Sequence, residues 1–189
     1  MSTRVITAGM CLLSFPSLFK ARKNEMDPDK EPRFEADFII QDAKTLKQLK
    51  AAAQEAAEGK WGNKIPKGLR SPFKDGDDPK KEDYPEYHGK TYIKAWSESR
   101  PGVCTMEDGT PVDVIDQNDV YAGCFVRVSV TAFAYEKSGN KGVSFQLNNV
   151  CKVKDGDSLG AVRIDAVAEF GGEVDAEAYG EPTTSSLLS

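Results

Sequence analysis

The strongest constraint on the fold is a run of strict alternation between residues 124 and 135, CFVRVSVTAFAY. The odd positions of this run carry aromatic, hydroxyl and arginine side chains. The even positions form an unbroken apolar face, made of Cys124, Val126, Val128, Val130, Ala132 and Ala134. An alternation of period two predicts a β-strand that buries one face in the core.

A second strand is expected to return beside the first. The residues SGN at positions 138–140 predict a tight turn, and the segment KGVSFQLNNVCKV follows them. The residues expected to point inward from the return strand are Val143, Phe145, Leu147, Cys151 and Val153. The two runs together predict a β-hairpin.

Two further segments alternate in the same way, RFEADFIIQ at 33–41 and TYIKAWS at 91–97. Between them, residues 42–59 predict one helix. Asp42 is a suitable N-cap, the interior has no Gly, Pro or β-branched run, and Gly59 is the expected end. The residues that share the apolar face of this helix are Leu46, Leu49, Ala53 and Ala56.

The N-terminal segment RVITAGMCLLSFPSLF, residues 4–19, is apolar enough to be tested as a secretion signal. Thr7, Ser14 and Pro16 interrupt the apolar run, and cations follow it in place of a small-residue cleavage site. We therefore expect a first strand with both faces largely buried. The sequence has no stretch of the roughly 20 apolar residues that a membrane helix needs.

Charge divides the chain of 189 residues into two parts. The formal net charge is −5, and no Lys or Arg follows Arg163. Six acids lie beyond that position, so the rest of the chain carries +1. We expect one domain at residues 1–164 and a disordered acidic tail at residues 165–189, because the tail has too few large apolar residues to offset its ordering entropy. The tail is either a solubilising segment or an interaction segment that competes for a basic groove.

A long loop at residues 60–89 is expected to bring positive charge to the domain. It contains four prolines and the turn-rich segment KDGDDPKKEDYP, and loops of this length are usually functional or mobile. Its acid-free first part, KWGNKIPKGLRSPFK, carries the cations expected to contact phosphates, Lys60, Lys64, Lys67, Arg70 and Lys74. Trp61 and Phe73 are either stacking rings or anchors. We favour anchoring for at least one, because Pro66 and Pro72 stiffen the loop.

Aromatic side chains occupy strand positions that alternation leaves outside the core. A solvated face of an antiparallel sheet would carry mainly charged and hydroxyl side chains. The positions concerned are Tyr92, Trp96, Phe125, Phe133 and Tyr135. Either a second layer of the protein or stacked nucleic-acid bases would satisfy such a face. The odd or even position of a ring along its strand does not tell whether the protein or a base covers it. We expect about half of the five rings to pack within the protein.

The sequence lacks the motifs that mark common enzyme classes, since Walker A, GxSxG and HExxH patterns are absent. The single histidine, His88, lies in a turn-like segment. Asp75, Asp77 and Asp78 lack the spacing and the later Glu of a calcium loop, so we read them as turn formers. The four cysteines form no CxxC pair and are expected to be reduced thiols in the cytoplasm. We therefore expect no catalytic residue, metal or cofactor.

Three blocks of the sequence share features with one known protein family. They are RVITAGMCLLSFPSLF, YHGKTYIKAWSESRPGV, and DVYAGCFVRVSVTAFAY with GNKGVSFQLNNVCKVKDGDSLG. Within residues 4–170 the chain resembles the small single-stranded DNA-binding proteins of tailed bacteriophages, of the Enterobacter-phage type. The resemblance implies a mainly β, OB-fold-like five-stranded barrel that coats single-stranded DNA, without catalysis, in phage replication, recombination and repair. It also implies an acidic tail that contacts replication enzymes, although this tail ends in TTSSLLS and not in acids and an aromatic.

The candidate DNA-binding residues follow from the aromatic rings and cations. Besides the residues of the basic loop and the five strand aromatics, they include Lys94, Arg100, Arg127 and Lys152. The candidate partner-binding residues of the tail are Glu169, Phe170, Glu173, Asp175, Glu177, Tyr179 and Glu181. The residues also leave open a phage structural or host-takeover protein that uses the aromatic face as a protein interface.

Overall fold

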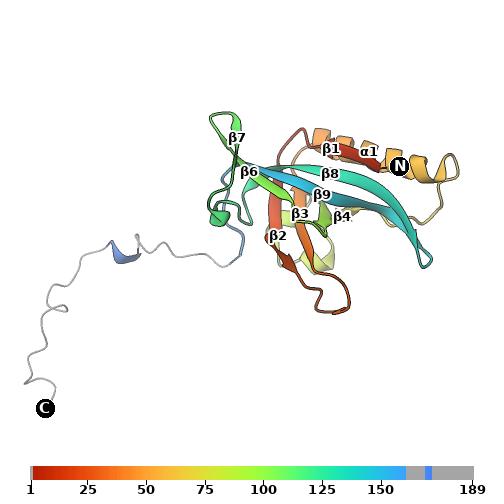
Figure 1. Cartoon of the computed structure of the whole chain (residues 1–189), viewed down its shortest axis with the longest axis horizontal. Coiled ribbons are helices and arrows are strands. Elements are labelled where there is room, and N and C mark those ends of the chain that lie inside the picture. Colours follow the sequence, from red (N-terminus) through yellow and green to blue (C-terminus); the bar gives the residue numbers. More distant parts are fainter. Residues whose placement is uncertain (1, 161–168, 172–189) are drawn as a thin grey trace, which may run out of the picture.

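Five strands close into a barrel in the computed structural model of the chain, which describes residues 2–160 and 169–171 (Figure 1). The strands follow each other around the ring in the order β2, β3, β5, β9 and β8, and β8 pairs with β2 to close it. Their bounds are Cys11–Arg22 for β2, Arg33–Ile40 for β3, Thr91–Ser97 for β5, Phe125–Lys137 for β8 and Asn140–Lys154 for β9. Among the pairs of this ring, only β5–β9 is parallel. The ring confirms the five-stranded barrel that the resemblance implies.

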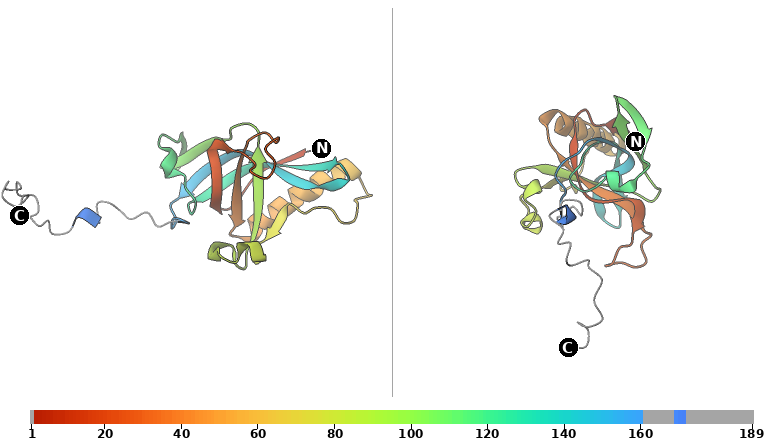
Figure 2. Two further views of the ribbon diagram at one scale, coloured as in Figure 1. Left: turned by 90° about the horizontal axis from the view of Figure 1, so that it is seen from below. Right: turned by 90° about the vertical axis from the view of Figure 1, so that its left-hand side faces the viewer.

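The remaining described strands extend this ring. β1 (Ser2–Ile6) pairs with β8, and β4 (Phe73–Asp75) pairs with β5. The hairpin of β6 (Gly102–Glu107) and β7 (Thr110–Asp113) continues the sheet beyond β9. It lies at the opposite end of the molecule from the tip of the β8–β9 hairpin, as Figure 1 and the left view of Figure 2 show. A short helical turn, η3 (Gln117–Asp119), follows this extension.

The predicted helix is confirmed as α1 (Ala43–Trp61), which lies against β1 and β8 (Figure 1). Asp42 caps it by accepting a hydrogen bond of 2.7 Å from the backbone N–H of Thr45. The predicted end at Gly59 is wrong, because Gly62 adopts the positive φ of 58° and its N–H bonds to the carbonyl of Glu58. Lys60 and Trp61 therefore belong to the last helical turn and not to the loop.

The core confirms the alternation of β8 and corrects that of β9. The even residues of β8 from Val126 to Ala132 are buried, as are Val143, Phe145 and Leu147 of β9. Beyond Leu147 the register shifts, because Ser129 faces Asn149 whereas Val130 faces Leu147. This bulge moves the inward positions of β9 by one residue, so Val150 is buried. The inward positions predicted for Cys151 and Val153 are wrong, and both side chains are partly exposed.

The N-terminal apolar run forms two strands and not the single strand expected. β1 and β2 are separated by a turn at residues 7–10, where Gly9 packs against the start of α1. A Cβ atom at Gly9 would meet the carboxylate of Asp42 and the hydroxyl of Thr45, so only glycine allows this approach. β2 then buries Cys11, Leu13 and Leu18 in the core.

The predicted long loop divides into two structured parts. Residues 62–72 run from α1 back to the sheet, and Arg70 exchanges two backbone hydrogen bonds with β9, with the carbonyl of Lys141 and the N–H of Val143. Residues 76–90, which we call the strap, contain the turns η1 (Pro79–Lys81) and η2 (Pro85–Tyr87). The N–H of Gly76 donates to the carbonyl of Lys90 at 2.8 Å and closes the base of the strap.

Most of the acidic tail lies outside the described residues, including the candidate residues Glu173, Asp175, Glu177, Tyr179 and Glu181. The disorder expected there stays a prediction. Glu169 and Phe170 are described, and both are exposed. Within the described part of the chain, α1 is the longest helix, and no helix is long and apolar enough to cross a membrane.

Candidate nucleic-acid interface

Three aromatic side chains line up across the outer face of the barrel. The ring of Trp96 on β5 meets the ring of Phe133 on β8 edge to face, with centroids 6.1 Å apart. Phe133 in turn lies 6.5 Å from Tyr135 on the same strand. We call Trp96, Phe133 and Tyr135 the aromatic track. All three side chains are partly exposed, and aromatic rings exposed on a sheet are a common platform for stacking bases.

A cation covers one end of the aromatic track, and the backbone of a second basic residue lies near the other end. The guanidinium carbon of Arg33 lies 4.0 Å from the centroid of the Trp96 ring. At the other end, the hydroxyl of Tyr135 and the backbone of Arg70 both crowd the α-carbon of Gly142 on β9, where a Cβ atom would come within 2.8 Å of each. Gly142 therefore lets Tyr135 and Arg70 lie side by side, and Arg70 is the basic-loop residue that these contacts bring to the track.

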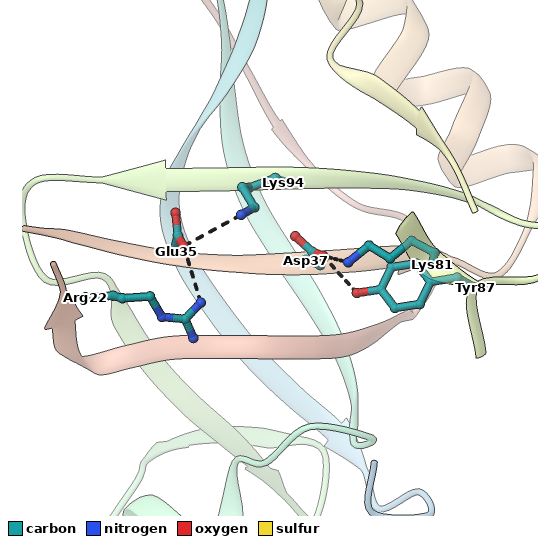
Figure 3. A network of polar contacts seen from close by, with 6 residues as sticks. All are labelled: Arg22, Glu35, Asp37, Lys81, Tyr87 and Lys94. Atoms are coloured by element: carbon teal, nitrogen blue, oxygen red, sulfur yellow. Dashed lines mark hydrogen bonds and ion pairs between the residues drawn. The ribbon is translucent and has the colours of Figure 1, made fainter. Parts of the chain in front are cut away.

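A basic hollow of about 520 Å³ opens beside Arg33, between the β2–β3 loop and the strands. Its lining includes five cations and three acids, and its residues are Arg22, Lys23, Asn24, Glu25, Lys30, Glu31, Arg33, Glu35 and Lys94. The Glu35 carboxylate pairs with Arg22 at 3.5 Å and with Lys94 at 3.6 Å (Figure 3). Both cations remain 40% or more exposed, so they can turn towards a phosphate.

The strap covers the sheet face next to the basic hollow. Asp37, which follows Glu35 on the same face of β3, is buried and accepts bonds from Lys81 at 3.2 Å and from the Tyr87 hydroxyl at 2.8 Å (Figure 3). Burial, together with the bond to Asp37, raises the pKa of Tyr87 above its usual value. Glu35, which lines the basic hollow, and Asp37, which anchors the strap through a buried ion pair, therefore lie two residues apart on one face of β3.

The strap corrects the position expected for Tyr92. Its side chain is only 7% exposed and packs edge to face on Tyr87, with centroids 4.8 Å apart. Burial raises the pKa of its hydroxyl. Tyr92 thus belongs to the protein's own second layer, one of the two possibilities that the sequence left open, and is not on the open face with Trp96.

Trp61 and Phe73 anchor the basic loop, as favoured for at least one of them. Both rings pack against the main core, and Phe73 meets Phe145 edge to face at 5.8 Å. The cations Lys60, Lys64, Lys67 and Lys74 are exposed on α1, the following loop and β4. No described contact joins these four lysines to the aromatic track, so their predicted contacts with phosphate stay predictions.

The other candidate residues lie apart from the aromatic track. Lys152 is paired with Asp155 at 2.7 Å, and Lys154 covers the ring of Phe125 at 4.7 Å. The Nε of Arg127 donates to the carbonyl of Thr7. Arg100 is exposed in the β5–β6 loop, with its guanidinium 5.7 Å from the Phe19 ring.

The polar residues read as turn formers fill that role. Asp75 accepts a bond from the N–H of Asp77, and Asp77 accepts one from the N–H of Gly89 across the base of the strap. His88 is exposed, and its Nε2 lies 3.0 Å from the carbonyl oxygen of Glu82. These contacts fix the path of the strap.

Sequence reasoning missed four cations of the basic hollow, Arg22, Lys23, Lys30 and Arg33. A signal was present, because Lys20, Arg22 and Lys23 close one apolar strand and Arg33 opens the next. A hairpin between those strands would have placed the cations together, beside the aromatics of a neighbouring strand. The pairing of β3 with β5, which puts Glu35 opposite Trp96, is the tertiary fact that completes the site.

The closed five-stranded barrel, with aromatic rings and cations on the outer face of β3 and β5, defines an OB-fold protein of the oligonucleotide-binding kind. Sequence comparison is more specific. The chain belongs to the family of the single-stranded DNA-binding protein of Enterobacter phage Enc34, whose sequence model matches residues 3–179.

Solved structures agree on the fold. The single-stranded DNA-binding protein of bacteriophage Enc34, in complex with single-stranded DNA, superposes with a TM-score of 0.67 at 21% identity, covering 84% of this chain and 89% of that one. The single-stranded DNA-binding protein gp2.5 of bacteriophage T7 superposes with a TM-score of 0.54 at 16% identity, covering 92% and 99% of the two chains. A search of curated proteins found no match.

Proposed function

We propose that this chain binds single-stranded DNA along the aromatic track and the basic hollow. The observation that carries the proposal is the placement of Arg33, which stacks on Trp96 and also lines the hollow. One continuous surface thus offers rings for bases and cations for phosphates. These are the two components that single-strand binding requires.

The contacts favour binding without sequence preference. Every base has a π-face, and each base stacked on a ring contributes roughly 1–3 kcal/mol. The cations of the basic hollow would neutralise phosphates, which are the same for every sequence. Trp96, Phe133 and Tyr135 therefore hold bases, and Arg22, Lys23, Lys30, Arg33 and Lys94 hold the backbone.

We further propose that the protein coats and protects DNA in phage replication, recombination and repair, as a non-enzymatic protein of the host cytoplasm. Membership of a phage single-stranded DNA-binding family supports this role. The acidic tail, with the candidate residues named above, would contact replication enzymes. Its charge of −6 beyond Arg163 supports an electrostatic role in such contacts.

Titration with oligo-dT tests the proposal. The chain has two tryptophans, and we expect quenching from Trp96 on the track and not from Trp61, which packs on the core. A Trp61→Phe variant should keep the quenching, and a Trp96→Phe variant should lose it. Poly-rU and duplex DNA serve as competitors. An unchanged fluorescence in both variants, with no mobility shift at low salt, would refute the proposal. Self-association through the track without DNA would instead favour a protein interface.

A further inference from the structure

A second group of aromatic rings lies on the same outer face as the aromatic track. On β5, Lys94 stands between Trp96 and Tyr92, and Tyr92 is covered by the strap. The Lys81 ammonium lies among four rings, with Nζ to centroid distances of 4.6 Å to Phe15, 5.5 Å to Tyr84, 4.3 Å to Tyr87 and 5.2 Å to Tyr92. These rings form a cage around the Lys81 ammonium, which pairs with Asp37 on β3.

The members of the cage differ sharply in exposure. Tyr87 is fully buried and Tyr92 nearly so, whereas Tyr84 is 37% exposed. The Lys81 ammonium forms an ion pair with Asp37 inside the fold, so it already has a partner and is not the group that would meet a ligand. Phe15 is partly exposed, and Tyr84 is the most exposed ring of the cage and so the one that an incoming ligand can reach most readily.

The surroundings hold the ring of Tyr84 in a fixed orientation. Phe15 meets it edge to face with centroids 5.2 Å apart, and Tyr87 also meets it edge to face, with centroids 6.2 Å apart. A ring fixed in this way loses little conformational entropy when a base stacks on it. Tyr84 therefore has the properties of a preorganised platform, with large area and few freely rotating bonds.

The backbone of Phe15 supports a function for this cage. Phe15 has a φ of 45°, a left-handed conformation that is uncommon for a residue other than glycine. It lies where the β2–β3 register breaks between Ser14 and Ser17. Such strained positions cluster at active sites and ligand-binding sites. Here the strain accompanies the placement of the Phe15 ring against Tyr84.

We propose that Tyr84, supported by Phe15, is a further base-stacking position for single-stranded nucleic acid. This inference rests on the proposed function and extends its site across β2. Glu35 on β3 and Ser17 on β2 face each other, and Phe15 precedes Ser17 by two residues. A DNA strand that leaves the basic hollow past this pair would therefore reach Phe15. Short oligonucleotides would fill the aromatic track and the hollow, and longer ones would also reach Tyr84.

Affinity measured against oligonucleotide length tests this position. A Tyr84→Ala variant should bind long oligo-dT roughly tenfold more weakly than the original protein, the loss of one stacked base. It should bind the shortest oligo-dT that quenches Trp96 with unchanged affinity. Tyr84→Phe is the matched control, because it keeps the ring and should bind every length as the original protein does.

Three results would overturn the inference. Equal affinities of Tyr84→Ala and the original protein at every length would exclude stacking, and an equal loss at every length would indicate that Tyr84 only supports the strap. A photo-cross-link from a terminal 5-iodo-deoxyuridine of long oligo-dT to the Tyr84 peptide is expected in the unmutated protein, and cross-links confined to the aromatic track would contradict it. Failure of the proposed function itself would appear separately, as an absence of Trp96 quenching by any oligonucleotide.

Discussion

The salt dependence of DNA affinity can be predicted from the cations of the basic hollow. Each phosphate neutralised on a single strand contributes about −0.7 to the slope of log affinity against log salt. Five cations line the hollow, so all five contacts together would give a slope of roughly −3.5 and about a hundredfold loss of affinity between 50 and 200 mM salt.

Neutralising two of these cations should lower the slope by a calculable amount. Lys23 and Lys30 lie in the β2–β3 loop, away from the core, and a Lys23→Gln, Lys30→Gln variant should fold normally. With three contacts left, the slope becomes roughly −2.1, and the loss between the same salt concentrations falls to about twentyfold. Fluorescence titration with oligo-dT at five or more salt concentrations measures the slope.

The matched control removes the same charge from a different surface. Lys44 and Lys47 are exposed on α1, which packs against β1 and β8 and contributes no residue to the basic hollow. A Lys44→Gln, Lys47→Gln variant has the same net charge as the hollow variant and should keep the original slope. If the two double variants give equal slopes, the hollow does not hold the phosphates, and net charge alone governs the affinity.

Three further predictions concern the strap and the tail. An Asp37→Ala substitution leaves the Lys81 ammonium buried without its partner and should lower the free energy of unfolding in urea by roughly 3 kcal/mol; a change near zero would contradict a buried pair. Because the pKa of Tyr87 is raised in the folded state, its contribution to stability is complete below the unfolded pKa of about 10 and is lost as pH rises above that value. Alkaline unfolding of a Tyr87→Phe variant should therefore depend less steeply on pH than that of the original protein, and parallel curves would refute this. Deleting the residues after Arg163 should tighten DNA binding, most visibly at low salt, because six negative charges no longer compete for the hollow; equal affinities would leave the tail a solubilising role.

Local patterns predicted the elements that depend on one stretch of chain. The period of β8 is regular from Val126 to Ala132, so its core face could be assigned from sequence. The helix was equally clear, because its cap and its apolar face lie within one segment. The prediction of the inward-facing residues of β9 failed after Leu147, because the position of a bulge depends on the partner strand and has no fixed sequence signature.

The candidate site was predicted in part. Trp96, Phe133 and Tyr135 were named from alternation, and the structure places them together. Phe125 was named on the same grounds but lies beneath Lys154, in a different cluster. The odd or even position of a residue along a strand predicts which face of the strand it occupies. It does not predict what covers that face. For the same reason the burial of Tyr92 could not be read from its strand.

The sequence by itself determined the building blocks of this protein, because hydrophobic periodicity, helix capping and charge segregation are properties of neighbouring residues. The family resemblance added the way in which the strands close into a barrel. Only the tertiary structure decided which part of the outer face stays open. The ion pair of Asp37 with Lys81 joins residues 44 positions apart and holds the strap over one part of the sheet. The basic hollow and Trp96 remain open beside it, since the contacts that divide covered from open surface are long-range and no local pattern encodes them.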